Sequence, residues 1–378
     1  MTKLKILMFV DRMRTGGIQI LLINLLSIFD RNKYQIDVLL LDDGIHYPLE
    51  EKLSEMNVHV YKLENTWINK PIDYIKYNTN VKRFFARHHD YHVVHLHSSS
   101  KNYLILKYAQ MYNIPIRIAH SHNTGFQTHN PLKVLFGNLL KKRLIKYSTD
   151  LLACSKIAGE WLFGSRLVNS GRVIIIKNGV DLEKYKYNPQ LRKNKRTELG
   201  VNDRIVIGNI GRFVEQKNHT FLLDIFAEIK KIEPKAILIL AGVGELMDSM
   251  KDKAKVLGIN KDVIFLGFRT DVNEILQAID LFLMPSLYEG FPVTAIEAQA
   301  SGLPCILSSS ITKEAELLDN TIYIDLNQTA EFWAKCAVQI AGSTNREDSF
   351  YILKSKGFDI ADMALTLDGI YCRKVEGI

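Results

Sequence analysis

The sequence has little cysteine and no long apolar run, and both absences exclude classes of protein. Its four cysteines stand far apart and no pair has metal-ligand spacing, so reduced, structural thiols are expected. No stretch approaches the roughly 20 apolar residues that a membrane span needs. The apolar run within residues 3–11 is too short for a signal peptide and is expected to form a first strand. These absences predict a protein that stays in the cytoplasm.

The composition that is present is that of an ordinary globular protein, with 47% hydrophobic and 24% charged residues. Its 378 residues correspond to two or three domains of roughly 100–200 residues each. The charge is uneven, because residues 1–150 hold 21 of the 49 Lys and Arg residues but only 12 of the 41 Asp and Glu residues. Ten of the 11 histidines also lie there. We therefore expect this part to face something anionic or a membrane surface.

Short apolar, β-branched runs alternate with longer helical patterns along the whole chain. Such runs, separated by helices, are typical of parallel sheets with both faces covered. The expected strands are Lys5–Val10, Ile36–Leu41, His59–Leu63, Val93–His97, Ile114–Ala119, Leu151–Cys154, Val173–Ile176, Ile205–Ile210, Ala236–Ala241, Val263–Gly267, Leu281–Met284, Pro304–Leu307 and Ile322–Ile324. The sequence therefore predicts an α/β protein with two Rossmann-like, doubly wound domains. Ligands are expected in a central cleft that faces the carboxyl ends of both sheets.

A polar segment with proline, Asp181–Asp203, separates the two series of strands and is expected to connect the domains. Its charge run at residues 192–196 is interpreted as a solvated linker face. The predicted domains are residues 1–184 and 185–356.

Glycines and histidines stand at the expected strand ends of the first domain. Gly16 and Gly17 follow the first strand and precede an apolar helix, where they let the backbone approach an anionic ligand, although a plain tight turn explains them equally well. Two histidine pairs end later strands: His95 with His97, and His120 with His122. Alternate residues of a strand share a face, so either pair could bind a metal, but no carboxylate or cysteine accompanies them at ligand spacing. We therefore favour polar contacts of the second pair with a substrate and expect no metal site.

Charged residues follow the strand ends of the second domain. Gly211 and Arg212 come directly after one strand, and Lys217 lies just before the next helix, a combination that suits a diphosphate. Glu289 lies on the loop after a later strand, and Glu297 lies on the following helix, two turns along. Both carboxylates can accept hydrogen bonds from sugar hydroxyls. A solvated helix surface is the alternative for either glutamate alone.

These motifs together resemble the retaining glycosyltransferases of family 4, which have the GT-B architecture. The resemblance rests on Gly16-Gly17, on Asn178-Gly179-Val180-Asp181, on Gly211-Arg212 with Lys217, and on Glu289 and Glu297 with seven residues between them. The segment 301–314 is similar to members that build capsular polysaccharides and exopolysaccharides. Ser308-Ser309-Ser310 departs from the paired glycines of many relatives, which affects the expected shape of the pocket. The resemblance also implies that a helix over residues 357–378 crosses back to the first domain.

The resemblance implies a role for each matching position. Arg212 and Lys217 would hold the donor diphosphate, Glu289 the donor sugar, and Glu297 the ribose. His122, with His120 as the second choice, would contact the sugar near the reacting carbon. Backbone groups elsewhere would complete the donor site; they belong to Gly16 and Gly17, to Gly211, to Phe268 and Arg269 near the nucleobase, and to Gly290, Phe291, Pro292 and Val293 at the start of the helix that carries Glu297.

The implied activity is transfer of a hexose from a nucleotide diphosphate sugar, with UDP preferred, to a glycan or lipid-linked acceptor with retention of configuration. The expected setting is the synthesis of cell-surface polysaccharide. The chain has no Asp-x-Asp motif, so Arg212 and Lys217 are expected to replace a divalent metal, and no other cofactor is expected. One alternative is a dinucleotide-dependent oxidoreductase, although Gly-x-Gly-x-x-Gly is missing. Another is a non-catalytic protein that binds nucleic acid or lipid through its basic face, although no nucleic-acid-binding motif is present.

Residues 131–146 form a basic amphipathic stretch, Pro131 to Lys146, of the kind that lies on anionic membranes. A helix that packs its apolar side on the domain is the alternative. The stretch predicts peripheral contact with the inner face of a membrane.

Overall fold

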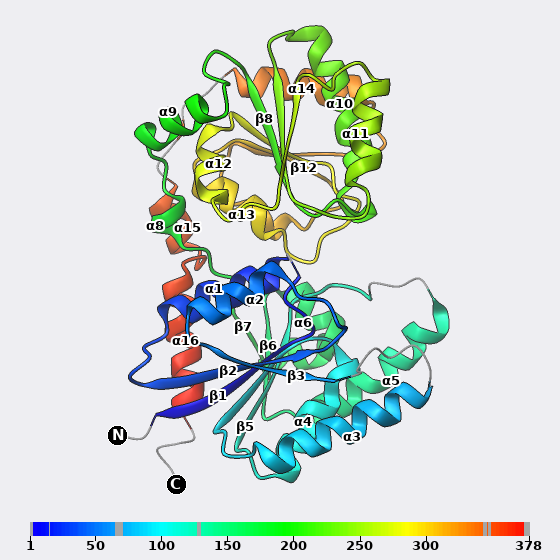
Figure 1. Cartoon of the computed structure of the whole chain (residues 1–378), viewed down its shortest axis with the longest axis vertical. Coiled ribbons are helices and arrows are strands. Elements are labelled where there is room, and N and C mark those ends of the chain that lie inside the picture. Colours follow the sequence, from blue (N-terminus) through cyan, green and yellow to red (C-terminus); the bar gives the residue numbers. More distant parts are fainter. Residues whose placement is uncertain are drawn as a thin grey trace. The chain divides into compact units, whose positions relative to one another are not determined.

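The computed structural model describes residues 3–14, 16–64, 71–126, 130–342, 346 and 349–373. The chain forms two compact units, one of residues 1–179 and 360–378 and one of residues 180–359 (Figure 1). The predicted boundaries stand after residues 184 and 356, and the units divide after Gly179 and after Asp359. The two segments that enter and leave the second unit are paired, because Val180 and Asp359 form a parallel bridge.

The first unit contains a seven-stranded parallel sheet in the order β3-β2-β1-β4-β5-β6-β7. Its strands are β1 (Leu4–Val10), β2 (Tyr34–Leu41), β3 (His59–Leu63), β4 (Val93–His97), β5 (Ile116–Ser121), β6 (Asp150–Ala153) and β7 (Val173–Ile175). Its α-helices are α1 (Gly17–Ile28), α2 (Pro48–Glu55), α3 (Pro71–Arg87), α4 (Tyr103–Met111), α5 (Pro131–Tyr147), α6 (Lys156–Phe163), α7 (Ser165–Asn169) and α16 (Ile360–Cys372), with a 3₁₀ turn at Ser100–Asn102.

The second unit contains a six-stranded parallel sheet in the order β10-β9-β8-β11-β12-β13. Its strands are β8 (Val206–Ile210), β9 (Ile237–Ala241), β10 (Val263–Gly267), β11 (Leu281–Met284), β12 (Cys305–Ser308) and β13 (Thr321–Ile324). Its α-helices are α8 (Leu182–Tyr185), α9 (Pro189–Glu198), α10 (His219–Ile232), α11 (Met247–Val256), α12 (Val272–Ala278), α13 (Val293–Ala300), α14 (Ala330–Ala341) and α15 (Phe350–Ser355), with 3₁₀ turns at Glu215–Lys217 and Lys313–Ala315. The predicted fold class, two doubly wound α/β domains, is confirmed.

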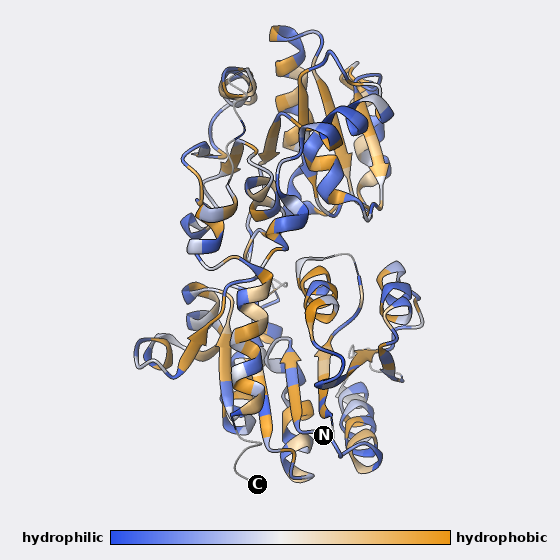
Figure 2. Ribbon diagram, turned by 90° about the vertical axis from the view of Figure 1, so that its left-hand side faces the viewer, coloured by the Kyte–Doolittle hydropathy of each residue, from blue (hydrophilic) through white to orange (hydrophobic). Residues whose placement is uncertain are grey.

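The central strands are mainly apolar because helices cover both faces of each sheet (Figure 2). Ile6, Leu7, Met8 and Phe9 are successive residues of β1, point alternately to opposite faces, and are all fully buried. Figure 2 shows the strands of both sheets as mainly hydrophobic, whereas the helices carry polar residues on part of their surface. All 13 expected strands form, with bounds that differ by two residues or fewer. The four cysteines are free.

Helix α16 belongs to the first unit, where it packs against α1 (Figure 1). Tyr34 on β2 hydrogen-bonds to Asp368 of α16, and Lys33 pairs with the same carboxylate. The predicted return of the last helix to the first domain is therefore seen for residues 360–372; residues 374–378 lie outside the described residues. Within the described part of the chain, no helix is long and apolar enough to cross a membrane.

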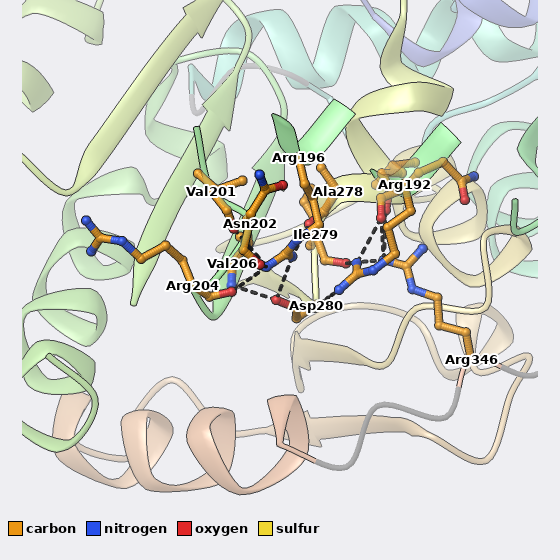
Figure 3. A network of polar contacts seen from close by, with 12 residues as sticks. Arg192, Arg196, Val201, Asn202, Arg204, Val206, Ala278, Ile279, Asp280 and Arg346 are labelled. Carbon is orange, nitrogen blue, oxygen red and sulfur yellow. Dashed lines mark hydrogen bonds and ion pairs between the residues drawn. The ribbon is translucent and has the colours of Figure 1, made fainter. Parts of the chain in front are cut away.

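The charge run at residues 192–196 is not a solvated linker face, and this prediction is wrong. Lys195 and Arg196 on α9 are 5% and 7% exposed. Arg196 pairs with the buried Asp280 at 3.1 Å, and Arg192 pairs with the same carboxylate at 2.5 Å (Figure 3). Asp280 also accepts a hydrogen bond from the backbone N–H of Val206, the first residue of β8, at 2.8 Å.

The arginines donate hydrogen bonds to carbonyl groups at the carboxyl end of α12. The last carbonyl groups of a helix have no partner within the helix. Arg196 donates to the carbonyl oxygen of Ala278, and Arg192 donates to those of Gln277 and Ile279 (Figure 3). Arg346, which follows α14 in the sequence, also donates to the carbonyl oxygens of Gln277 and Ile279. Cations at a helix carboxyl end also interact favourably with its dipole. The segment therefore belongs to the second unit, and its charges are structural.

We expect Asp280→Ala to destabilise the second unit strongly, because it leaves the buried Arg196 and the half-buried Arg192 without their anion. Removing one partner of a buried pair typically costs about 3–5 kcal/mol. Urea denaturation measures the effect, and Asp252→Ala is the control, since the pair of Asp252 with Lys255 is exposed and its loss should change stability little. Equal midpoints for the two variants would contradict the structural role of Asp280.

Candidate active site

Each sheet reverses its strand order at one place, between β1 and β4 in the first unit and between β8 and β11 in the second. Connections leave the carboxyl ends of these neighbouring strands toward opposite faces, so a crevice opens there, and ligands of doubly wound sheets bind at this point. Arg212 and Lys217 follow β8, and Glu289 follows β11. The sequence motifs of the second unit therefore lie at its switch point.

Glycines bring the loops after β8 and β9 into direct contact. Gly242 has a φ of +147°, and a Cβ atom there would lie 1.9 Å from the carbonyl oxygen of Gly211. A Cβ atom on Gly211 would in turn lie 3.2 Å from the side chain of Lys217. The backbone N–H of Gly211 donates to Ala241, and that of Phe213 donates to Val243. At Gly242, only glycine permits so close an approach of the two backbones.

The turn that carries Lys217 is fastened to the loop after β11. Asn218 has a left-handed φ of 53° and is the N-cap of α10, as predicted, but its side chain donates to the carbonyl oxygen of Pro285 rather than to its own helix. The backbone N–H of Leu287 donates to the carbonyl oxygen of Gln216 at 2.8 Å, and the Gln216 side chain donates to that of Tyr288 at 2.9 Å. These bonds hold the two loops in one position relative to each other.

The structure brings Lys217 and Glu289 into an ion pair. Nζ of Lys217 lies 2.7 Å from Oε1 of Glu289, and Nε2 of Gln216 donates to the other carboxylate oxygen at 3.3 Å. Arg212 is half-buried on the same loop, and its guanidinium makes no ion pair or hydrogen bond with the residues that the structure describes. The edge therefore carries one cation that is neutralised by a carboxylate and a second cation that is not.

Glu297 is buried in the middle of α13 and is only 4% exposed. Burial raises the pKa of its carboxyl group to about 7, and this outweighs the opposing effect of the hydrogen bond from Tyr185 on α8. Burial also raises the pKa of the Tyr185 hydroxyl well above its usual value. Near neutral pH this carboxyl group therefore exchanges between its charged and neutral forms.

The remaining predicted donor residues of the second unit lie around the same edge. Phe268 and Arg269 follow β10, and the Arg269 side chain pairs with Asp271 at 2.5 Å. Gly290 and Phe291 precede α13, and the Phe291 ring stacks on Phe358 with centroids 5.8 Å apart. Pro292 is the N-cap of α13 and Val293 its first residue. The backbone N–H of Val293 donates to the carbonyl oxygen of Phe291, and that of Ala295 donates to that of Pro292.

The four histidines of the first unit form one buried cluster rather than two separate pairs. Neighbouring strands β4 and β5 place His95 beside His120, with Nε2 and Nδ1 3.1 Å apart, and His97 beside His122, with Nδ1 and Nε2 2.9 Å apart. Burial lowers the pKa of His95 to about 3 and that of His122 to about 4, and it lowers those of His97 and His120 well below the usual value. All four imidazoles are therefore neutral at pH 7.

Both ring nitrogens of His122 are engaged, because Nδ1 lies 3.2 Å from Oδ1 of Asn178 and Nε2 contacts His97. Nε2 of His120 and Nε2 of His97 are buried and have no hydrogen-bond partner among the described residues. Of the two predicted histidines, His120 therefore has the available nitrogen. Gly16 is the N-cap of α1 and Gly17 its first residue, so the glycine pair opens a helix at the switch point of the first unit.

Several residues of these sites escaped the sequence analysis. Tyr185 contacts Glu297 from 112 positions away, and Gln216 bridges two loops, but neither residue type signals such a role by itself. Ser286 and Thr294 flank Glu289, and their hydroxyl groups are buried without a partner among the described residues. Asn178 belongs to a motif that the sequence analysis quoted, but its contact with His122 depends on tertiary structure.

Two doubly wound units with glycine turns, paired charges and helix amino ends at their switch points define the class of two-domain glycosyltransferases with the GT-B fold. Family models agree: residues 15–184 match "Glycosyltransferase Family 4", and residues 192–326 match "Glycosyl transferases group 1". The chain is 32% identical to the "Putative glycosyltransferase EpsF" of Bacillus subtilis over 97% of its own length and 96% of that protein. The chain belongs to the family-4 glycosyltransferases.

Other relatives extend this comparison. The chain is 25% identical to the "Capsular polysaccharide biosynthesis glycosyltransferase CapH" of Staphylococcus aureus over 98% of its own length and 99% of that protein. The crystal structure of Anabaena HepE in complex with UDP-glucose has the same fold, with a TM-score of 0.78 and 20% identity over 99% of this chain and 100% of that one. Membership of a transferase family leaves the oxidoreductase alternative without support.

We expect Glu297→Gln to stabilise the protein in mildly alkaline solution. A carboxyl group whose pKa is about 7 when folded and about 4.5 when unfolded loses folding stability as the pH rises between these values. Glutamine mimics the protonated form, so the variant should melt at a higher temperature than the parent protein at about pH 8 and at the same temperature near pH 4.5. Thermal melts across this range measure the effect, and exposed Glu183 on α8 gives the matched control, Glu183→Gln. A difference that does not change with pH would refute the assignment.

Proposed function

We propose that this glycosyltransferase moves a hexosyl group from a UDP-linked sugar to a glycan or lipid-linked saccharide, with retention, in the synthesis of cell-surface polysaccharide. The names of its relatives support the setting, since CapH takes part in capsular polysaccharide biosynthesis. An Escherichia coli relative, 32% identical over 58% of this chain and 58% of that protein, is a "UDP-Gal:alpha-D-GlcNAc-diphosphoundecaprenol alpha-1,3-galactosyltransferase". HepE was crystallised with UDP-glucose. These names support UDP and a lipid-linked acceptor.

The ion pair of Lys217 with Glu289 beside Arg212 is the observation that carries this proposal. A diphosphate at the switch point would replace Glu289 as the partner of Lys217 and would accept hydrogen bonds from the guanidinium of Arg212, since both cations suit phosphate oxygens. Glu289, released from Lys217, would accept hydrogen bonds from the sugar hydroxyls. The pair thus keeps both side chains in place until the donor binds.

The other roles follow from position. Glu297 would accept hydrogen bonds from the ribose hydroxyls in place of the one from Tyr185. The backbone at Phe268 and Arg269 would contact the nucleobase. The amino end of α13, where the helix dipole favours an anion, would lie beside the phosphate.

In the reaction, the bond between C1 of the sugar and the β-phosphate oxygen breaks, and its electron pair passes to the phosphate. The acceptor oxygen bonds to C1 on the same face, and its proton passes to the departing phosphate. The transition state resembles an oxocarbenium ion, and negative charge grows on the leaving group. Arg212 and Lys217 would stabilise that charge, so the transfer step would need no divalent metal.

We expect Lys217→Ala to lower kcat by about 10²–10³-fold, the usual cost of removing one donor that stabilises a developing anion. Release of UDP from a panel of UDP-sugars, in the presence of a lipid-linked glycan extract, measures the rate. Lys251→Ala is the matched control, because Lys251 is an exposed lysine of the same unit that pairs with Asp248. Near-normal turnover of Lys217→Ala would overturn the proposed role.

Helix α5 supports a membrane-bound acceptor. Gly137, Leu140 and Leu144 are buried against the first unit. The outer face carries four large apolar side chains at helical spacing, each more than half exposed, namely Leu132, Leu135, Phe136 and Leu139. The same face continues with Lys142, Arg143 and Lys146. In an anionic lipid layer, exposed apolar side chains of this kind would enter the acyl region, and the neighbouring lysines and arginine would contact the lipid phosphates.

We expect the protein to sediment with vesicles rich in anionic lipid at low salt and to remain in solution with neutral vesicles. Replacing Leu132 and Leu135 by Asp should abolish sedimentation, because a charged side chain no longer enters the acyl region. Leu365→Asp on α16 is the control, since Leu365 is exposed to a similar degree outside α5. Equal recovery with both kinds of vesicle would contradict the membrane contact.

A further inference from the structure

The histidine cluster contains two imidazole nitrogens for which the contacts described so far give no use. They are Nε2 of His97 and Nε2 of His120, on neighbouring strands β4 and β5. His120 is fully buried and His97 is 3% exposed. A buried polar atom without a partner costs free energy, so such atoms in a folded protein call for a ligand.

The direction of each hydrogen-bond chain determines what these nitrogens can do. A carboxamide oxygen only accepts, so Nδ1 of His122 donates to Oδ1 of Asn178, and Nε2 of His122 then accepts from Nδ1 of His97. A neutral imidazole has one proton, so Nε2 of His97 carries a bare lone pair. The cluster therefore presents at least one buried imidazole lone pair.

The hydrogen bonds of His95 and His120 have the same direction when Nδ1 of His95 donates to the Tyr371 hydroxyl at 2.7 Å. Nε2 of His95 then accepts from Nδ1 of His120, and Nε2 of His120 is also a lone pair. In this arrangement each nitrogen belongs to a ring whose other nitrogen donates to a fixed acceptor. That is the usual environment of metal-binding histidines, in which the outer partner sets the tautomer and the ring orientation.

We propose that His97 and His120 bind a transition-metal ion of the Zn²⁺ type through their Nε2 atoms. One nitrogen from each of His95, His97 and His120 lies within 4.8 Å of the others, and the hydrogen bond of His95 to Nδ1 of His120 directs Nε2 of His120 toward the site. Zn–N bonds of about 2.0–2.1 Å bridge nitrogens up to roughly 4 Å apart, and rotation of the rings closes the remaining gap. Imidazole ligands suit Zn²⁺, Cu²⁺ and Ni²⁺, whereas Mg²⁺ prefers oxygen.

The proposed ion is structural. It links the carboxyl ends of β4 and β5, and its outer partners extend to Tyr371 on α16 and to Asn178 at the end of the first unit's main segment. The residues proposed for the donor diphosphate belong to the second unit, and the proposed ligands of the ion belong to the first. In the sequence the two histidine pairs are separate, and the site becomes visible only because the fold brings them into one cluster.

Calorimetric titration of the metal-stripped full-length protein tests the proposal. We expect one Zn²⁺ per chain, a higher melting temperature with Zn²⁺, visible absorption from Co²⁺ bound in its place, and no response to Mg²⁺. His97→Ala and His120→Ala should each weaken Zn²⁺ binding at least tenfold. Tyr371→Phe keeps the ring and removes only the outer hydroxyl, and it should weaken binding by about tenfold. His46→Ala, an exposed histidine of the same unit, is the control.

Zn²⁺ binding that is unchanged in His97→Ala, or a folded parent protein that binds no Zn²⁺, would overturn the proposal; in the latter case the two nitrogens share a buried water only. The outcome is independent of the proposed transfer reaction. Chelator should lower the melting temperature through the histidine site and leave the rate of UDP release unchanged. A rate that falls in chelator and recovers with Mg²⁺ would instead contradict the metal-independent transfer step.

Discussion

The constraint on which both sites depend is the reversal of strand order inside each parallel sheet. A parallel crossover must return over one face of the sheet, so only two neighbouring strands, whose connections leave to opposite faces, have open carboxyl ends. In the second unit these strands are β8 and β11, and in the first they are β1 and β4. Lys217 and Glu289 are 72 residues apart in sequence and meet because their strands are neighbours. The histidine cluster lies at the corresponding edge of the first sheet.

Close backbone approach is the second requirement of the donor edge. Gly211 and Gly242 let the loops after β8 and β9 touch, and the bonds between Gln216 and the loop after β11 complete a rigid frame. Such a frame fixes the loops that carry Arg212 and Lys217, and a site with fixed charges needs little reorganisation during a reaction. The cost of this arrangement is conformational strain that only glycine, or Asn218 in its left-handed conformation, tolerates.

Buried polar groups serve opposite purposes in different parts of this chain. Asp280 is paired with Arg192 and Arg196 and accepts a backbone hydrogen bond, so its burial stabilises the second unit. Glu297 is equally buried, and burial raises the pKa of its carboxyl group although Tyr185 and Lys184 both act to lower it. A stabilising group is one whose bonds are all made inside the fold. A group kept at a cost is the better candidate for contact with a ligand.

The sequence by itself determined the fold class, the 13 strands, the N-cap at Asn218 and the positions of Arg212, Lys217 and Glu289 at strand ends. These features depend on local propensity and periodicity, which are written in consecutive residues. Tertiary structure alone decided that Lys195 and Arg196 are buried, that Tyr185 contacts Glu297, and that four histidines of two strands share their hydrogen bonds. Charge runs look alike whether they meet water or a buried aspartate, and only the packing of distant segments supplies the partner that distinguishes the two.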